Sequence, residues 1–296
     1  MERLLILQER HSRWNKHEAG DAGGGRIYEE SLGGNRMKQF IVGSGWKMVK
    51  TYQDSIDTAR ELEKRLEGFH EFPVVIFPSF PAIPEICRKL SKESALKIGG
   101  QDLFWEDEGA YTGEISGKML LEIGCQYVEI NHQERRKYLH EDNEMANRKL
   151  KQALRLSLTP FLCMGEEEEG SDEEVRCFIE NQLSELLDGV GEAEASHIIF
   201  AYEPRWGIGK KNVVGLSHIQ SVHHKIRGFL AKRYGHNMAK QAYIVYGGGI
   251  TMERSLDIAA LPDVNGLFTT GCGIYADLYS ELVHTTAKML RQGEDR

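Results

Sequence analysis

Short apolar runs alternate with longer amphipathic stretches along most of the chain. Each run is only a few residues long and is rich in Val, Ile, Leu and Phe, as is typical of strands buried on both faces of a parallel sheet. The runs occupy 39–43, 74–78, 96–100, 127–131, 160–164, 198–203, 243–247 and 266–270. We therefore expect eight strands of this kind.

A stretch with the helical period of about 3.6 residues follows each run. These stretches lie near 52–66, 81–91, 116–123, 144–157, 172–187, 217–233, 252–259 and 276–291. Ser171, Ser217 and Thr251 stand at or beside the starts of three of them, where a side-chain oxygen can cap free backbone amides. The pattern predicts a helix after every strand.

This repeated order predicts an α/β fold, a single (β/α)8 barrel, because eight strand–helix units match a closed parallel barrel in number. An open, doubly wound sheet is the alternative.

Residues 1–36 differ from the rest of the chain, since they are glycine-rich and charged with one apolar run at 4–7. We expect a flexible N-terminal extension there, with a regulatory arm or a misassigned start as alternatives, and a barrel domain over 37–296.

The charge balance restricts the classes of ligand. With 37 basic and 45 acidic residues the formal net charge is −8, which argues against a nucleic-acid partner and requires any anion to be bound locally.

The five cysteines, without close pairs, indicate neither disulfides nor a zinc cluster. No run reaches the roughly 18 apolar residues of a membrane span, and the N-terminus lacks a signal-peptide core. We expect a cytoplasmic protein with no membrane partner.

Polar residues just past the strands are candidates for the active site, because the carboxyl ends of all barrel strands share one mouth. This position selects Lys47, His132 and Glu203, together with glycine-rich turns after the last three strands. A carboxylate, an imidazole, an ammonium group and exposed backbone amides can together move a proton and hold an anion.

Several motifs then carry a resemblance that spans roughly residues 38–290. They are GSGWKMVKT (43–51), GGQDLFWEDEGAYTGEIS (99–116), EINHQERRKY (129–138), CMGE (163–166), AYEPRWGIG (201–209), YGGGI (246–250) and NGLFTTG (265–271). In order and spacing they resemble the triosephosphate isomerase family, whose fold is the TIM barrel. The resemblance implies an aldose–ketose isomerase of glycolysis and gluconeogenesis acting on a small phosphorylated sugar, with no cofactor and no metal.

The resemblance also assigns catalytic roles. Glu203 is expected to remove a proton beside the substrate carbonyl and return it to the neighbouring carbon through an enediolate. His132 is expected to polarise the carbonyl as a neutral imidazole, as in triosephosphate isomerase itself, where a helix N-terminus keeps the imidazole neutral. Lys47 would supply fixed positive charge to the developing oxyanion and help to hold the phosphate.

Supporting residues follow from the same resemblance. Residues 205–213 correspond to a lid that closes over the substrate, as the loop of triosephosphate isomerase does. Glu166 is expected to pack near this lid, Glu134 and Arg135 to form ion pairs near a subunit contact, and Thr112 to reach into a neighbour's site in a homodimer. The residues expected to bind substrate or phosphate are Gly45, Gly209, Gly249, Thr270 and Gly271.

Some positions depart from the family pattern. Gly45 stands where Asn is usual, and Gln133 follows the catalytic histidine where Ser is usual. The phosphate turns have also changed, to Gly248–Gly249 and Thr270–Gly271. The space opened by Gly45 leaves an L-erythrulose 1-phosphate type isomerase as an alternative, and altered turns leave a non-catalytic phosphate-binding homologue as a further one.

Overall fold

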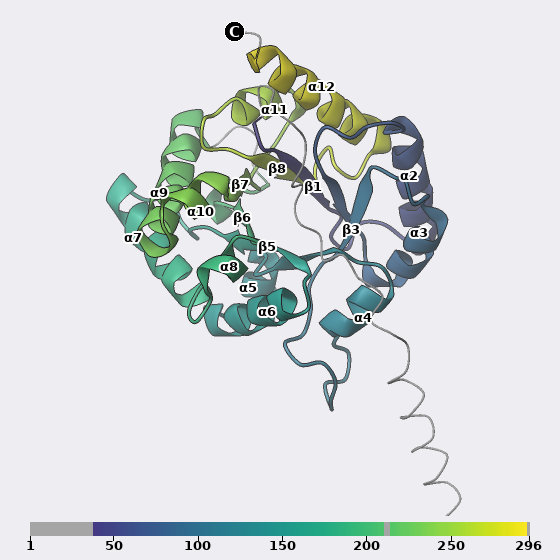
Figure 1. The fold of residues 1–296 in the computed structure, drawn as a ribbon, viewed down its shortest axis with the longest axis horizontal. Coiled ribbons are helices and arrows are strands. Elements are labelled where there is room, and N and C mark those ends of the chain that lie inside the picture. The colour runs from purple at the N-terminus through teal and green to yellow at the C-terminus, as the bar shows by residue number, and fades with distance from the viewer. Residues whose placement is uncertain (1–37, 210–213, 295–296) are drawn as a thin grey trace, which may run out of the picture. The chain divides into compact units, whose positions relative to one another are not determined.

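The computed structural model describes residues 38–209 and 214–294 (Figure 1). The expected N-terminal extension, residues 1–36, lies outside the described residues. Among the residues described, no helix is both long enough and apolar enough to cross a membrane.

The predicted barrel is confirmed: eight parallel strands close in sequence order, with β1 paired to both β2 and β8. The strands are β1 Ile41–Gly45, β2 Val74–Phe77, β3 Leu96–Gly100, β4 Tyr127–Ile130, β5 Thr159–Met164, β6 Ile199–Tyr202, β7 Tyr243–Tyr246 and β8 Gly266–Thr269. Helices surround the strands on the outside (Figure 1). The open, doubly wound sheet is thereby excluded.

The first strand begins later than predicted and continues through two glycines, Gly43 and Gly45. Gly43 faces the barrel interior, where an added Cβ would lie only 2.9 Å from the ring of Phe268 and 3.0 Å from that of Phe161. The missing side chain therefore makes room for aromatic rings inside the barrel, and the strand hydrogen bonds continue past it.

The helices also follow the predicted order, with additions. They are α2 Tyr52–Arg65, η1 Phe80–Ala82, α3 Ile83–Lys89, α4 Gly117–Glu122, α5 Gln133–Leu139, α6 Asn143–Arg155, α7 Asp172–Leu186, α8 Glu192–Ala195, η2 Arg205–Gly207, α9 Leu216–Tyr234, α10 His236–Gln241, α11 Met252–Ala259 and α12 Ala276–Glu294. Four short segments, α5, α8, α10 and η2, are additional to the eight predicted helices, because segments of a few residues are too short for the 3.6-residue period to register.

Two of the three predicted caps stand at the N-cap position. Ser171 caps α7 in a reciprocal arrangement with Glu174, and Thr251 occupies the N-cap of α11 without a side-chain hydrogen bond. The prediction for Ser217 was wrong: Gly215 is the N-cap of α9, so Ser217 lies inside the first turn. The helix starts earlier because the apolar Leu216 packs against the core.

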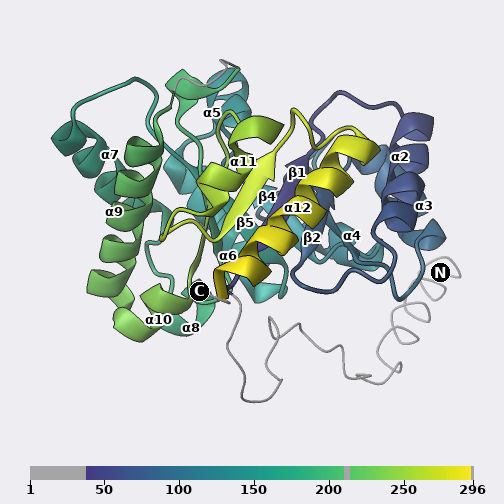
Figure 2. The same cartoon turned by 90° about the horizontal axis from the view of Figure 1, so that it is seen from above.

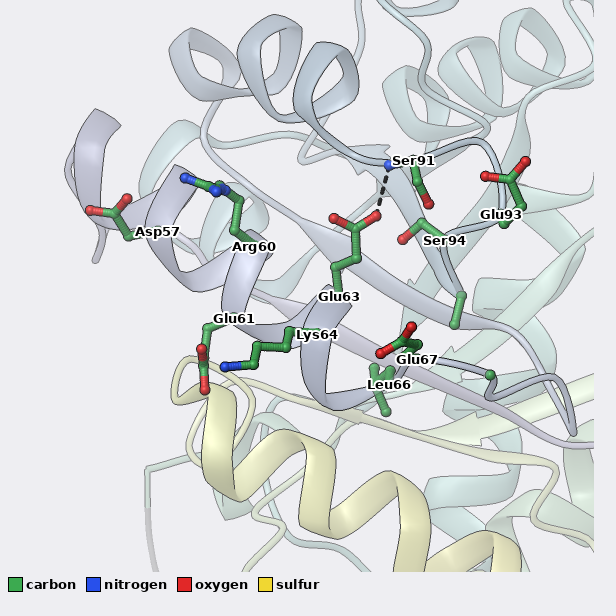
Figure 3. Close-up of a pocket in the computed structure, with 12 residues that line it drawn as sticks. Asp57, Arg60, Glu61, Glu63, Lys64, Leu66, Glu67, Ser91, Glu93 and Ser94 are labelled. Atoms are coloured by element: carbon green, nitrogen blue, oxygen red, sulfur yellow. Dashed lines mark hydrogen bonds between the residues drawn. The ribbon is translucent and has the colours of Figure 1, made fainter.

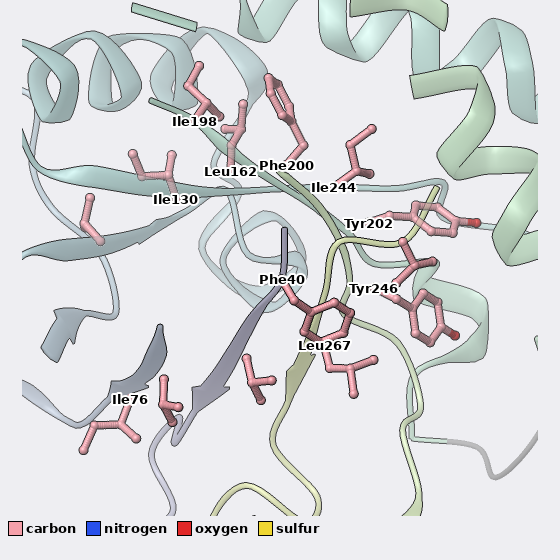
Figure 4. Close-up of a cluster of buried hydrophobic side chains, with 14 of the residues drawn as sticks. Phe40, Ile76, Ile130, Leu162, Ile198, Phe200, Tyr202, Ile244, Tyr246 and Leu267 are labelled. Carbon is pink, nitrogen blue, oxygen red and sulfur yellow. The ribbon is translucent and has the colours of Figure 1, made fainter. Parts of the chain in front are cut away.

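The core has two layers separated by the strands. Outward-facing strand residues pack against the helices, and Figure 4 shows several of them: Ile76, Ile130, Leu162, Phe200, Ile244 and Leu267. Inside the barrel, the rings of Phe77, Phe161 and Phe268 contact one another with centroids 5.1, 5.6 and 5.3 Å apart. The aromatic trio fills the interior, so the barrel is a packed scaffold and not a pore.

The two ends of the barrel differ. Figure 2 shows α5 and α11, which follow strands, at one end, and α8 and α10, which precede strands, at the other. Figure 3 shows a depression lined by α2 and by the loop before β3, where Glu63 accepts a hydrogen bond from the Ser91 amide at 2.7 Å. It lies toward the amino ends of the strands, whereas the candidate catalytic residues follow their carboxyl ends.

Candidate active site

Lys47 lies two residues past the end of β1 in an unusual backbone conformation. Its φ is +50°, in the left-handed region that non-glycine residues seldom adopt. Its carbonyl oxygen accepts a hydrogen bond from Gln101 Nε2 at 2.8 Å, and its Nζ donates to Glu134 Oε1 at 2.8 Å. Backbone strain of this kind is concentrated at functional sites, and the hydrogen bond to Glu134 holds the ammonium group.

His132 is the N-cap residue of α5. Its Nδ1 accepts a hydrogen bond from the Glu134 backbone amide at 3.2 Å. In the neutral ring the proton is therefore carried by Nε2, which lies 3.5 Å from Glu203 Oε1. Burial, together with the positive charges of Lys47 and Arg136, lowers the pKa of His132 to about 3. The ring is thus a neutral hydrogen-bond donor at physiological pH.

Glu203 follows β6 and is 2% exposed. Its backbone amide donates to Met164 O at 2.7 Å, which extends the pairing of β6 with β5, and its Oε2 accepts from the Gln133 amide at 3.4 Å. Burial raises the pKa of Glu203 to about 7, although Lys47 and Arg136 oppose the shift. A carboxylate that titrates near neutrality is suited to take up and release a proton.

The three residues predicted from strand ends therefore lie close together at the carboxyl end of the barrel, and a fourth joins them. Glu129 on β4 places its Oε1 3.7 Å from His132 Nε2. Sequence reasoning missed this residue, although a lone acid within the apolar run 127–131 was a visible signal. Arg136 was missed too: its Nη1 donates to the Gly165 carbonyl at 3.2 Å, and its charge lowers the pKa of Glu203.

Glu166 anchors the start of the predicted lid. The buried carboxylate accepts hydrogen bonds from Tyr202 Oη and Trp206 Nε1, each at 2.8 Å, and His218 Nε2 lies 3.4 Å away. These donors lower the pKa of Glu166 despite its burial. The first part of the lid, 205–209, is thus tied to β5 and β6, whereas residues 210–213 lie outside the described part of the chain.

The glycine-rich turns expected to bind phosphate all follow strands at the same end of the barrel. Gly209 has φ +77° and an added Cβ would meet nothing within 4 Å. Gly249 and Thr270 are half-buried and Gly271 is exposed, so their backbone is open to a ligand. Gly45 is the last residue of β1, and a Cβ added there would lie 3.5 Å from Glu129 Oε2. Thr112 is exposed between β3 and α4.

Arg135 was expected to form ion pairs, and it belongs to a largely buried network behind α5 whose other members were not predicted. Its Nη2 lies 2.6 Å from Glu141 Oε1 and 2.9 Å from Asp102 Oδ2. Lys149, 2% exposed, contacts the same two carboxylates at 2.7 Å each. Two cations thus balance two anions beneath the turn that carries the candidate histidine.

We expect Lys149→Met to destabilise the protein by about 3–5 kcal/mol, because the change leaves Asp102 and Glu141 buried with a single cation. Thermal unfolding monitored by circular dichroism would show this as a drop of about 10 °C or more in Tm. The exposed Lys118, which pairs with Asp107 at 2.9 Å, provides the control. Equal Tm values for Lys149→Met and Lys118→Met would contradict a structural role for the network.

Three of the pocket side chains are also of the types that can bind a metal ion. Among the described residues, Glu129, His132 and Glu203 form a group whose ligand atoms all lie within 4.8 Å of one another. Lys47 and Arg136 direct positive charge at the same side chains. This positive charge disfavours a cation at the group, while burial favours protons on its carboxyl groups.

Comparison with known proteins agrees with the geometry. The family model described as "Triosephosphate isomerase" matches residues 40–286. A protein named triosephosphate isomerase from Dictyoglomus turgidum is 33% identical over 84% of this chain and 100% of its own length. Its namesake from Thermoanaerobacter pseudethanolicus is 35% identical over 84% of this chain and 100% of its own length. The chain belongs to the triosephosphate isomerase family.

Proposed function

We propose that this protein interconverts dihydroxyacetone phosphate and D-glyceraldehyde 3-phosphate by proton transfer through an enediolate. Family membership supports this reaction type, an intramolecular aldose–ketose isomerisation. The single observation that carries it is the clustering of Glu203, neutral His132 and Lys47 at the carboxyl end of the barrel.

Each side chain has one role in this reaction. Glu203 takes the proton from the carbon next to the carbonyl, and its near-neutral pKa lets it return the proton to the adjacent carbon. His132 Nε2–H donates to the oxygen on which charge develops, since its Nδ1 is already occupied. Lys47 stabilises the same negative charge with its fixed positive charge.

We further propose that the phosphate binds to backbone amides of Gly209, Gly249, Thr270 and Gly271. Backbone amides hold a dianion without a basic surface, which suits a chain of formal net charge −8. Closure of the lid would then exclude water from the enediolate. The anchoring of Trp206 and Tyr202 on Glu166 provides the fixed end of such a motion.

The test is a coupled assay of the purified protein on glyceraldehyde 3-phosphate and on a tetrulose 1-phosphate. A kcat/KM far higher for the triose phosphate supports the proposal. The reverse preference would favour the four-carbon alternative. Turnover of neither substrate, with retained phosphate-analogue binding, would favour a non-catalytic homologue.

We expect kcat/KM to fall tenfold per pH unit below about pH 7, because Glu203 acts as a base and must be ionised in the free enzyme. His132 stays neutral throughout, since its pKa is lowered to about 3. The groups that face Glu203 are Lys47, Glu129, His132, Arg136 and Cys163. A flat profile between pH 5 and 8, measured with kcat/KM at constant ionic strength, would rule out this assignment of the base.

We also propose that the protein is a cytoplasmic homodimer, in which Thr112 reaches into the neighbouring active site. Each subunit would consist of a barrel domain at 37–296, with residues 1–36 as an appendage. Met48 directly follows Lys47 and is 97% exposed, and Val49 and Tyr111 are exposed as well. Large apolar side chains beside a catalytic loop suit a covered surface. Sedimentation that finds a fully active monomer would exclude the dimer. With a triose phosphate as substrate, glycolysis and gluconeogenesis are the expected setting.

A further inference from the structure

Glu129 adds a second carboxyl group to the mouth of the barrel. It lies on β4 between Val128 and Ile130, which both pack in the outer core, so its own side chain points inward. The side chain is 6% exposed, and its Oε1 lies 3.7 Å from His132 Nε2. It therefore borders the atoms that the isomerisation uses.

Its neighbour across the mouth is Gly45. An added Cβ there would lie 3.5 Å from Glu129 Oε2 and 3.3 Å from Phe268 Cζ. A longer side chain at position 45 would cover this oxygen. The glycine thus keeps one oxygen of the buried carboxyl group open toward the substrate space, while the Phe161 and Phe268 rings close the barrel beneath it.

A carboxyl group is costly at this place. An apolar side chain would continue the packing of the aromatic trio, whereas a buried ionised carboxylate without a paired cation costs several kcal/mol. The nearest partners of Glu129 are a neutral imidazole and a second carboxyl group. Burial, and then the charge of Glu203, raise the pKa of Glu129 well above its usual range, although Lys47 opposes the shift. It is an O–H donor when Glu203 is ionised.

We propose that Glu129 is a substrate-contacting residue of this site, whose carboxyl O–H donates a hydrogen bond to the pair of oxygens that His132 Nε2 also binds. The inference rests on the proposed isomerisation. The reacting part of such a substrate has oxygens on two adjacent carbons, and removal of one carbon-bound proton leaves a single negative charge that either oxygen can carry in the enediolate. A second uncharged donor beside the histidine stabilises this charge without repelling the carboxylate of Glu203.

The ligand class follows from this arrangement. Glu129 and His132 recognise a planar group with oxygens on two adjacent carbons. A small phosphorylated α-hydroxy aldehyde or ketone has this feature. Specificity for this group, and not only packing, would explain why an acid stands in an otherwise apolar barrel interior.

The test compares Glu129→Gln with Glu129→Leu. Glutamine retains a donor of the same length, whereas leucine fills the volume without one. We expect kcat/KM on glyceraldehyde 3-phosphate to fall about tenfold for Gln and about 10²–10³-fold for Leu, mainly in kcat. Ile130→Val, on the same strand but facing outward, is the control. Affinity for 2-phosphoglycolate, whose carboxylate mimics the two oxygens, should fall about tenfold or more in Glu129→Leu by calorimetry.

The outcomes separate this inference from the proposed function. Equal and small losses in both variants would show that Glu129 only fills space, and would overturn it. The same conclusion follows if Glu129→Leu binds 2-phosphoglycolate as the unaltered protein does. A third outcome is that the unaltered protein turns over no sugar phosphate but binds 2-phosphoglycolate more tightly than Glu129→Leu does. This result would reject the proposed isomerisation and would still support a contact between Glu129 and the ligand. Melting temperatures of Glu129→Leu at or above the unaltered value would exclude unfolding as the cause of lost activity.

Discussion

Glu203→Gln is expected to lower kcat on glyceraldehyde 3-phosphate by roughly 10³–10⁴-fold, because it removes the base and keeps the shape of the side chain. The residue is 2% exposed, and glutamine can occupy the same volume. Binding of substrate should change far less, since His132, Lys47 and the phosphate turns are untouched. Steady-state kinetics in the coupled assay, with kcat and KM resolved, measures both effects.

Glu203→Asp is the matched comparison. It retains the carboxylate but withdraws it by about 1 Å, a displacement that can itself cost about 10²-fold. Activity should therefore rank unaltered protein, Asp and Gln in descending order. Thermal unfolding should show no loss of stability in Glu203→Gln, because a buried carboxyl group with a raised pKa is removed. A Gln variant as active as the Asp variant would contradict the role of Glu203 as base.

The architecture and the grouping of Lys47, His132 and Glu203 could be predicted from the sequence because both depend on order along the chain. Short apolar runs marked every strand, and the residue just past a parallel strand must lie at the carboxyl end of the barrel. Lys47, His132 and Glu203 were identified from this rule and from the motifs around them. In the structure, His132 Nε2 lies 3.5 Å from Glu203 Oε1.

Glu129 could not be placed in the same way. Strands buried on both faces lack the alternation of polar and apolar residues that shows which side chains point inward. The run 127–131 therefore did not reveal that its acid faces the pocket while its neighbours face the helices. Only the register of β4 against β5, which pairs Glu129 with Phe161, fixes the direction.

The buried network around Arg135 was hidden for another reason. Asp102 is 47 residues from Lys149 in the sequence, whereas Glu141 and Lys149 are 8 residues apart, and each of the three residue types is usually found at the surface. Their common burial depends on how α5 and α6 pack over the loop after β3. Pairwise distances of this kind are properties of tertiary packing and leave no local signal in the sequence.

Lys47→Met is expected to lower kcat/KM by about 10²–10³-fold, since it removes fixed positive charge from the pocket in which the enediolate forms. Methionine has a similar length and no charge. The substitution should also move the acidic limb of the pH profile to higher pH, because Lys47 lowers the pKa of Glu203 in the intact site. Kinetics from pH 5 to 9 would record both changes in one set of measurements.

Glu134→Gln distinguishes the charge of Lys47 from its ion pair. It removes the negative charge that Lys47 Nζ contacts at 2.8 Å, Glu134 Oε1, but leaves the ammonium group in the site. If the lysine acts directly on the substrate, this variant should lose no more than about tenfold, since a partly exposed ion pair contributes little by itself. Equal losses in the two variants would instead mean that Lys47 acts by holding the turn of α5, and that the charge in the pocket comes from Arg136.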